Sequence, residues 1–133
     1  MTEPRHSATL DRQRTMLRTA MGPVIAAALA DPAVIEVMVN PDGRLWTDRH
    51  GAGRCDSGER LGTAEAERVI RLVASHIGQE CHRGRPIVSA ELPETGERFE
   101  GLLPPVTAAP CFAIRKPARV LYRLPDYVDA KVM

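Results

Sequence analysis

The 133-residue chain is long enough for one domain with a buried core, but short for a self-sufficient nucleotide-hydrolysing enzyme. Its 18 basic and 17 acidic residues nearly cancel, and only 4% of its residues are aromatic. Interleaved charges and few aromatic rings argue against a surface that attracts nucleic acid or stacks bases. No direct nucleic-acid partner is therefore expected.

The three cysteines, Cys55, Cys81 and Cys111, lack the paired spacing of zinc ligands. Cys81 and His82 could form half of a site, but a reducing compartment explains the odd cysteine count more simply, so no metal is expected. The amino terminus has no apolar run after its charges, and the longest apolar segment, 24–30, is too short to cross a bilayer. We expect a soluble, cytoplasmic protein.

Residues 1–16 are polar and predict a frayed or helical lead-in. Gly22-Pro23 then predicts a kink, or a second helix that begins at Pro23, because proline lacks an N–H and clashes with the preceding turn. Asp31-Pro32 predicts the end of the helix. The helix itself is predicted by apolar residues that recur at helical spacing, namely Leu17, Met21, Val24, Ile25 and Ala28.

Residues 34–49 predict a β-hairpin, because an apolar β-branched run and an alternating run flank the turn residues 40–43. The only tryptophan, Trp46, is expected to pack in the core, with a partner contact as the alternative. The Gly-rich segment 51–62 lacks the Gly-Lys-Ser/Thr ending of a phosphate-binding loop. It predicts a loop or a short third strand.

A second amphipathic helix is predicted after Thr63, which is expected to cap it. Glu65 and Glu67 lie favourably in its first turn, Gly78 is expected to end it, and His76 is expected to act as a terminal charge rather than as a base. Its predicted buried face consists of Ala66, Val69, Ile70, Val73 and Ile77.

Residues 87–117 predict three strands, separated by a tight turn and a proline-marked connection. Side-chain alternation places Arg98 on the face opposite Phe99, and Arg115 on the face opposite Ile114. Two fixed forks of N–H donors on rigid strands suit a phosphate. In the plainer reading, each arginine caps a sheet edge or pairs with a nearby glutamate such as Glu91, Glu94 or Glu100.

No segment matches GxxxxGK[ST], and no Ser/His/Asp or Cys/His set has supporting motif context. The glutamates around the turn (Glu91, Glu94, Glu97 and Glu100) could form an acid–base pair, but charged hairpin tips are commonly just solvated. No catalytic residue is assigned, and the chain alone is not expected to hydrolyse ATP.

Together, LADPAVIEVMVNPDGRLWTDR, ERVIRLVAS, IVSAELPETGERFEGLLPPV and FAIRKP resemble the amino-terminal domain of the TrbB family of conjugal-transfer ATPases, in the type II/type IV secretion ATPase superfamily. The resemblance runs from about Leu17 to Met133 and implies an α+β, PAS-like fold, with a mainly antiparallel sheet flanked by helices. It divides the chain into a lead-in (1–16), the secretion-ATPase amino-terminal domain (17–124) and the start of a linker or helix (125–133). That last element would lead to a RecA-like ATPase domain that the chain lacks, so we expect a fragment or a module whose continuation has been removed.

The resemblance further implies a homo-hexameric ring at the cytoplasmic face of the inner membrane. ATP and Mg²⁺ would bind between the two domains of the parent, and none would bind tightly to this chain alone. Arginines of this domain would reach the ATP phosphates, at the matching positions Arg98 and Arg115, with Lys116 as a weaker candidate. Implied partners are the RecA-like domain, other transfer-apparatus subunits and, peripherally, the membrane surface. The alternative is a stand-alone PAS-like interaction module without a nucleotide role, marked by an exposed apolar patch near Trp46 or the last helix.

Overall fold

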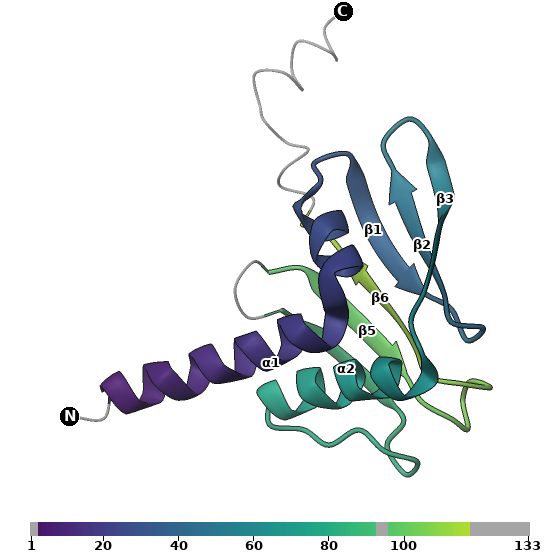
Figure 1. The fold of residues 1–133 in the computed structure, drawn as a ribbon. Helices are drawn as coiled ribbons and strands as arrows, with labels where there is room; N and C mark the ends of the chain where they lie inside the picture. The colour runs from purple at the N-terminus through teal and green to yellow at the C-terminus, as the bar shows by residue number, and fades with distance from the viewer. Residues whose placement is uncertain (1–2, 93–95, 118–133) are drawn as a thin grey trace, which may run out of the picture.

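Six antiparallel strands form one sheet, and both helices lie on the same face of it (Figure 1). The computed structural model describes residues 3–92 and 96–117, with side chains from residue 11 onwards. The α+β prediction is confirmed. The predicted connector 119–124, the predicted last helix and Glu94 lie outside the described residues. The elements are α1 (Glu3–Ala30), β1 (Val34–Val39), β2 (Arg44–Arg49), β3 (Gly53–Arg60), α2 (Thr63–His76), β4 (Ile87–Glu91), β5 (Arg98–Leu102) and β6 (Cys111–Arg115).

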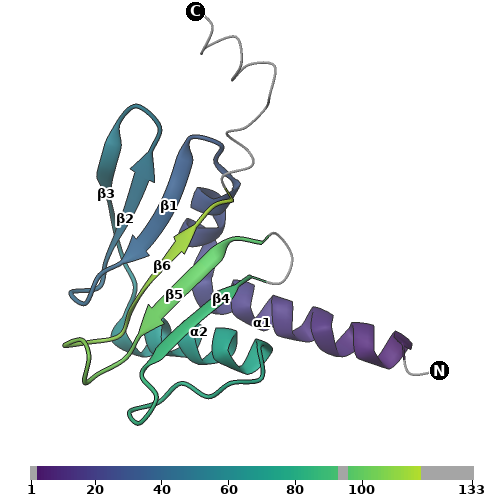
Figure 2. The same ribbon diagram turned by 180° about the vertical axis from the view of Figure 1, so that it is seen from behind.

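The strand order is β3-β2-β1-β6-β5-β4, so the last strand inserts between the first hairpin and the β4–β5 pair. Every pairing is antiparallel. Seen from behind, the sheet lies in front of both helices, and no helix of the described residues lies on its second face (Figure 2). One face is therefore the core side, and we call the other the uncovered face.

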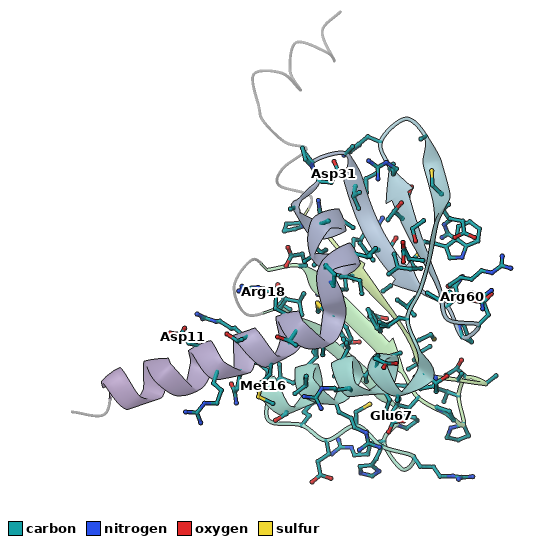
Figure 3. All side chains as sticks on the ribbon, in the orientation of Figure 1. Asp11, Met16, Arg18, Asp31, Arg60 and Glu67 are labelled. Carbon is teal, nitrogen blue, oxygen red and sulfur yellow. The ribbon has the colours of Figure 1, made fainter. Side chains whose placement is uncertain are left out.

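The helix α1 is bent at Gly22, whose φ of 86° and ψ of 171° lie outside the helical range. Glycine tolerates that conformation, and Pro23 can begin the following helical turn without a missing hydrogen bond. The predicted kink is confirmed. The first half of α1 projects away from the sheet and carries Asp11, Met16 and Arg18, whereas the second half lies against the sheet (Figure 3).

The predicted hairpin of β1 and β2 is confirmed, with Gly43 at a φ of 86° in its turn. The strand β3 is longer than the loop or short strand that its glycines suggested. It spans eight residues and pairs with β2, and Ser57 Oγ donates a hydrogen bond to the carbonyl of Leu45 at 2.6 Å. Asp56 adds an ion pair with Arg44 at 3.7 Å. Cross-strand contacts thus outweigh the weak strand propensity of glycine.

The helix α2 begins differently from the prediction. Gly62 is the N-cap residue, no side chain caps the helix, and Thr63 is already helical, so the predicted Thr63 cap is wrong. Instead, the Glu65 carboxylate folds back over Gly62, into the space that a Cβ there would occupy. The predicted end at Gly78 is confirmed: Gly78 has a φ of 74° and donates to the carbonyl of Ser75, while Gln79 donates to that of Ala74.

The core lies between the helices and the sheet. The predicted face of α2 is buried there, apart from Ile77, which is only partly buried. Phe99 of β5 stacks on Phe112 of β6 with a centroid distance of 5.3 Å. Trp46 is not in this cluster: Leu45 and Thr47 turn to the core side, so Trp46 lies half-buried on the uncovered face. The prediction that Trp46 packs in the core is wrong, because the alternation along β2 assigns it to the other face.

Candidate functional site

Four charged side chains form a row across the uncovered face. In register, Glu91 of β4 lies opposite Arg98 of β5, Arg98 opposite Arg115 of β6, and Arg115 opposite Glu36 of β1. Residues directly opposite in an antiparallel pair have Cβ atoms about 5 Å apart. The two arginines that the sequence singled out, 17 residues apart in the chain, are therefore direct neighbours with an acidic residue on either side.

The row borders an open groove with a volume of about 600 Å³. Both arginines are exposed, while their chain neighbours Phe99 and Ile114 are completely buried on the core side. The strands that carry the guanidinium groups are thus anchored by the hydrophobic core. The lining residues are Glu36, Glu91, Gly96, Arg98, Glu100, Ala113, Arg115, Lys116 and Pro117.

Within residues 3–92 and 96–117, neither Arg98 nor Arg115 forms an ion pair or a side-chain hydrogen bond. Glu91 and Glu100, which were predicted as possible partners, line the same groove but form no ion pair with either arginine. Two like charges directly opposite each other disfavour the folded sheet. A multivalent anion between them would relieve that repulsion and accept several charge-assisted hydrogen bonds.

Glu100 lies beside the row and is held by a cross-strand hydrogen bond, which Ser89 Oγ of β4 donates to Glu100 Oε2 at 3.0 Å. Ala113 lies opposite Glu100 on β6 and has no side-chain atom beyond Cβ. Glu36, Ser89 and Ala113 were missed by sequence reasoning. Alternation within each strand places them on a face, but only the pairing of the strands brings Glu36 and Ala113 to the groove and Ser89 beside Glu100.

Lys116 follows Arg115 and also borders the groove, but its ammonium group is engaged elsewhere. It donates a hydrogen bond to the backbone carbonyl of Asp31. Asp31 lies just past the end of α1 (Figure 3). Burial lowers the pKa of the Lys116 ammonium below its usual range, although the Asp31 charge acts in the opposite direction. A phosphate contact by Lys116 stays a prediction.

Asp31 itself ties three segments together. Its carboxylate accepts the backbone N–H of Ala33 at 2.9 Å and a guanidinium N–H of Arg49 at 2.7 Å. The hydrogen bond from Ala33, followed by that from Arg49, lowers the pKa of Asp31. These contacts join the end of α1 to the end of β2, through Arg49, and to the end of β6, through Lys116.

The described residues contain no group of three His, Cys, Asp or Glu side chains that could hold a metal ion. Cys81 is buried, and this burial raises the pKa of its thiol. The cysteines 55, 81 and 111 are all free thiols. In the part of the chain that the structure describes, no helix is both long and apolar enough to span a bilayer.

Comparisons with known proteins point to one group. The chain is 48% identical over 117 residues to a probable conjugal transfer protein TrbB of Sinorhizobium fredii, a match that covers 88% of the chain. It is 45% identical over all 133 residues to the conjugal transfer protein TrbB of Rhizobium radiobacter. No protein-family model matches the chain.

Among solved structures, the VirB11 ATPase of the Brucella suis type IV secretion system, in complex with sulphate, superimposes with a TM-score of 0.78 and 25% identity. That match covers 92% of the chain and 37% of VirB11. The chain spans only 36% of the Sinorhizobium relative and 40% of the Rhizobium relative. The likeness is thus to a part of each longer protein.

Proposed function

This chain is homologous to the TrbB conjugal transfer proteins over part of their length, and on that premise we propose that it is the nucleotide-sensing, amino-terminal domain of a conjugal-transfer ATPase. Arg98 and Arg115 would bind phosphates of an ATP molecule that a separate P-loop domain also holds. The observation that carries this proposal is the direct register of the two exposed guanidinium groups across β5 and β6, at the edge of one groove.

Three physical features support a phosphate ligand. The arginines come from rigid strands, their planar N–H forks match phosphate oxygens, and the like-charge repulsion between them favours a shared anion. The structurally similar VirB11 ATPase was solved in complex with sulphate, which has the tetrahedral shape and negative charge of a phosphate group. This chain has no P-loop sequence of its own, so phosphoryl transfer would depend on the partner domain.

The mechanism would couple phosphate contact to domain position. Bound ATP would bridge the arginine pair to the P-loop domain, with Mg²⁺ neutralising phosphate charge on the P-loop side. Hydrolysis would remove the bridging contact and allow this domain to swing. The same proposal includes assembly into a homo-hexamer at the cytoplasmic face of the inner membrane, beside other subunits of the transfer apparatus.

The proposal can be tested in a complete ATPase. This chain would replace the matching segment of the Rhizobium radiobacter TrbB, and ATP turnover of that chimera would be measured. Arg115→Ala should lower kcat/KM by about 10- to 100-fold, because a hydrogen bond to a charged group contributes about 1.5–3 kcal/mol. Arg98→Ala should have an effect of the same order.

Arg54→Ala provides the matched control. Arg54 is an exposed arginine on the edge strand β3, outside the groove lining, so its removal should leave turnover unchanged. Equal turnover in the Arg115→Ala and Arg54→Ala chimeras would refute the phosphate role of the arginine pair.

A second candidate function is a protein-interaction module without a nucleotide role. Apolar groups that reach solvent favour it: Ile87 and Val106 are 57% and 51% exposed, and Trp46 is half-buried on the uncovered face. In that case Trp46→Ala should abolish conjugation in cells while both arginine variants keep it. Loss of transfer in the arginine variants alone would exclude this candidate.

A further inference from the structure

Glu100 places a negative charge beside the arginine pair. A site that bound only inorganic phosphate would not need this negative charge. It follows Arg98 by two residues on β5, so it lies on the same face and about 7 Å further along the strand. Ser89 lies opposite it on β4 and Ala113 opposite it on β6. Glu100 is thus flanked by one small hydroxyl side chain and one methyl group.

The Glu100 carboxylate is oriented but not saturated. Ser89 donates one hydrogen bond to Oε2, and within the described residues no arginine or lysine forms an ion pair with Glu100. A carboxylate offers about four acceptor positions, so most of its hydrogen-bonding capacity remains for a ligand. Because Ala113 ends at Cβ, the space above it gives a ligand access to the carboxylate from the groove.

This arrangement disfavours inorganic phosphate and favours a phosphate that carries hydrogen-bond donors. A carboxylate near the bound anion repels it, and that cost is offset only if the ligand donates hydrogen bonds to the carboxylate. The hydroxyl groups of ribose are such donors, and acidic side chains bind ribose hydroxyls in dinucleotide-binding folds. The arginine pair and Glu100 together therefore fit the two ends of a nucleoside phosphate.

We infer that Glu100 accepts hydrogen bonds from ribose hydroxyls and makes this groove select nucleoside phosphates over inorganic polyphosphate. Ser89 acts as the positioning residue of Glu100. The inference rests on the proposed function in one respect, since the arginine pair must hold a phosphate of the same ligand.

The test is a titration of the 133-residue chain, followed by NMR, with ATP, with 2′,3′-dideoxy-ATP and with inorganic tripolyphosphate, at the same Mg²⁺ concentration. ATP should bind about tenfold more tightly than dideoxy-ATP, which is the effect of one hydrogen bond to a charged group. Glu100→Ala should reduce that ratio to about one and should tighten tripolyphosphate binding. Glu100→Gln retains an acceptor oxygen and should keep part of the ratio, and Ser89→Ala should reduce it only partly.

Two results would overturn the inference alone: equal affinities for ATP and dideoxy-ATP in the unmodified chain, or a ratio that survives in Glu100→Ala. The proposed function fails separately. If Arg98→Ala and Arg115→Ala leave tripolyphosphate binding unchanged, or if none of the three ligands binds, both ideas are wrong. The NMR spectrum of each variant also reports whether the fold is intact, and the exposed Arg54→Ala variant should match the unmodified chain in every titration.

Discussion

The two faces of the sheet are formed by the same strands but differ in burial and in charge. On the core side, Phe99, Phe112 and Ile114 are buried and pack as one cluster. On the uncovered face, their chain neighbours Arg98 and Arg115 remain exposed and without ion pairs among the described residues. Packing on the core side therefore stabilises the fold. The uncovered face can then carry two like charges side by side, although their repulsion costs free energy of folding.

The sharpest test of this comparison uses adjacent residues of β5. Phe99→Ala should lower the free energy of unfolding by about 3–5 kcal/mol, because it removes a fully buried ring and leaves a cavity. Arg98→Ala should change it by less than about 0.5 kcal/mol, since an exposed residue loses little packing. Urea denaturation measures both values. Similar losses for the two variants would contradict the division between the faces.

A smaller change in the free energy of unfolding is expected when a small residue of the sheet is replaced by a larger one. A Cβ at Gly101 would lie 2.9 Å from Ile70 Cγ1 and from Phe99 Cε1, so Gly101→Ala should cost about 2–3 kcal/mol by overpacking the core side. Ala113→Leu, on the uncovered face, should stay within about 0.5 kcal/mol and yet block phosphate binding by filling the groove. Thermal unfolding and a tripolyphosphate titration check the pair. A strongly destabilised Ala113→Leu variant would count against an open groove.

The kink in α1 determines which part of that helix covers the sheet. A Cβ at Gly22 would meet no atom within 4 Å, so the effect of Gly22→Ala isolates the backbone conformation. A φ of 86° with a ψ of 171° is nearly exclusive to glycine, and the substitution should cost about 1–2 kcal/mol. Unchanged stability in chemical denaturation would show that the kink is not required by the fold.

The smallest effect on stability is expected for the contacts of Asp31 with Ala33, Arg49 and Lys116. The pKa of Asp31 is lowered in the folded chain by Ala33 and Arg49, so its ionised form contributes stability above about pH 4. That contribution is lost as the pH falls through the folded pKa. Asp31→Asn should therefore reduce stability at neutral pH and flatten its decline in acid, as thermal melts across pH 2–7 would record.

The partner of that carboxylate supplies the control. Arg49→Ala should produce only part of this flattening, because the hydrogen bond from Ala33 to the Asp31 carboxylate remains. The double variant should lose less stability than the sum of the two single variants, because both substitutions remove the same 2.7 Å contact. Fully additive effects of the two substitutions would contradict the coupling.

Local patterns predicted the fold better than they predicted the site. The Gly22-Pro23 kink, the glycine end of α2 and the strands that carry Arg98 and Arg115 follow from neighbouring residues in the chain. The adjacency of Arg98 and Arg115, in contrast, depends on β6 entering the sheet beside β5, which no local pattern encodes. Trp46 was misplaced for a related reason: residue type suggested burial, whereas the register of β2 assigned it to the uncovered face.

The central claim is that both guanidinium groups contact phosphate, and NMR of the arginine side-chain Nε–H groups tests it most directly. Titration of the chain with ATP should shift the signals of Arg98 and Arg115 together, with one shared dissociation constant in the millimolar range, while Arg54 stays unchanged. A millimolar constant corresponds to about −4 kcal/mol, which suits a site that a second domain would complete. Uniform shifts across all exposed arginines, or separate constants for Arg98 and Arg115, would contradict the account.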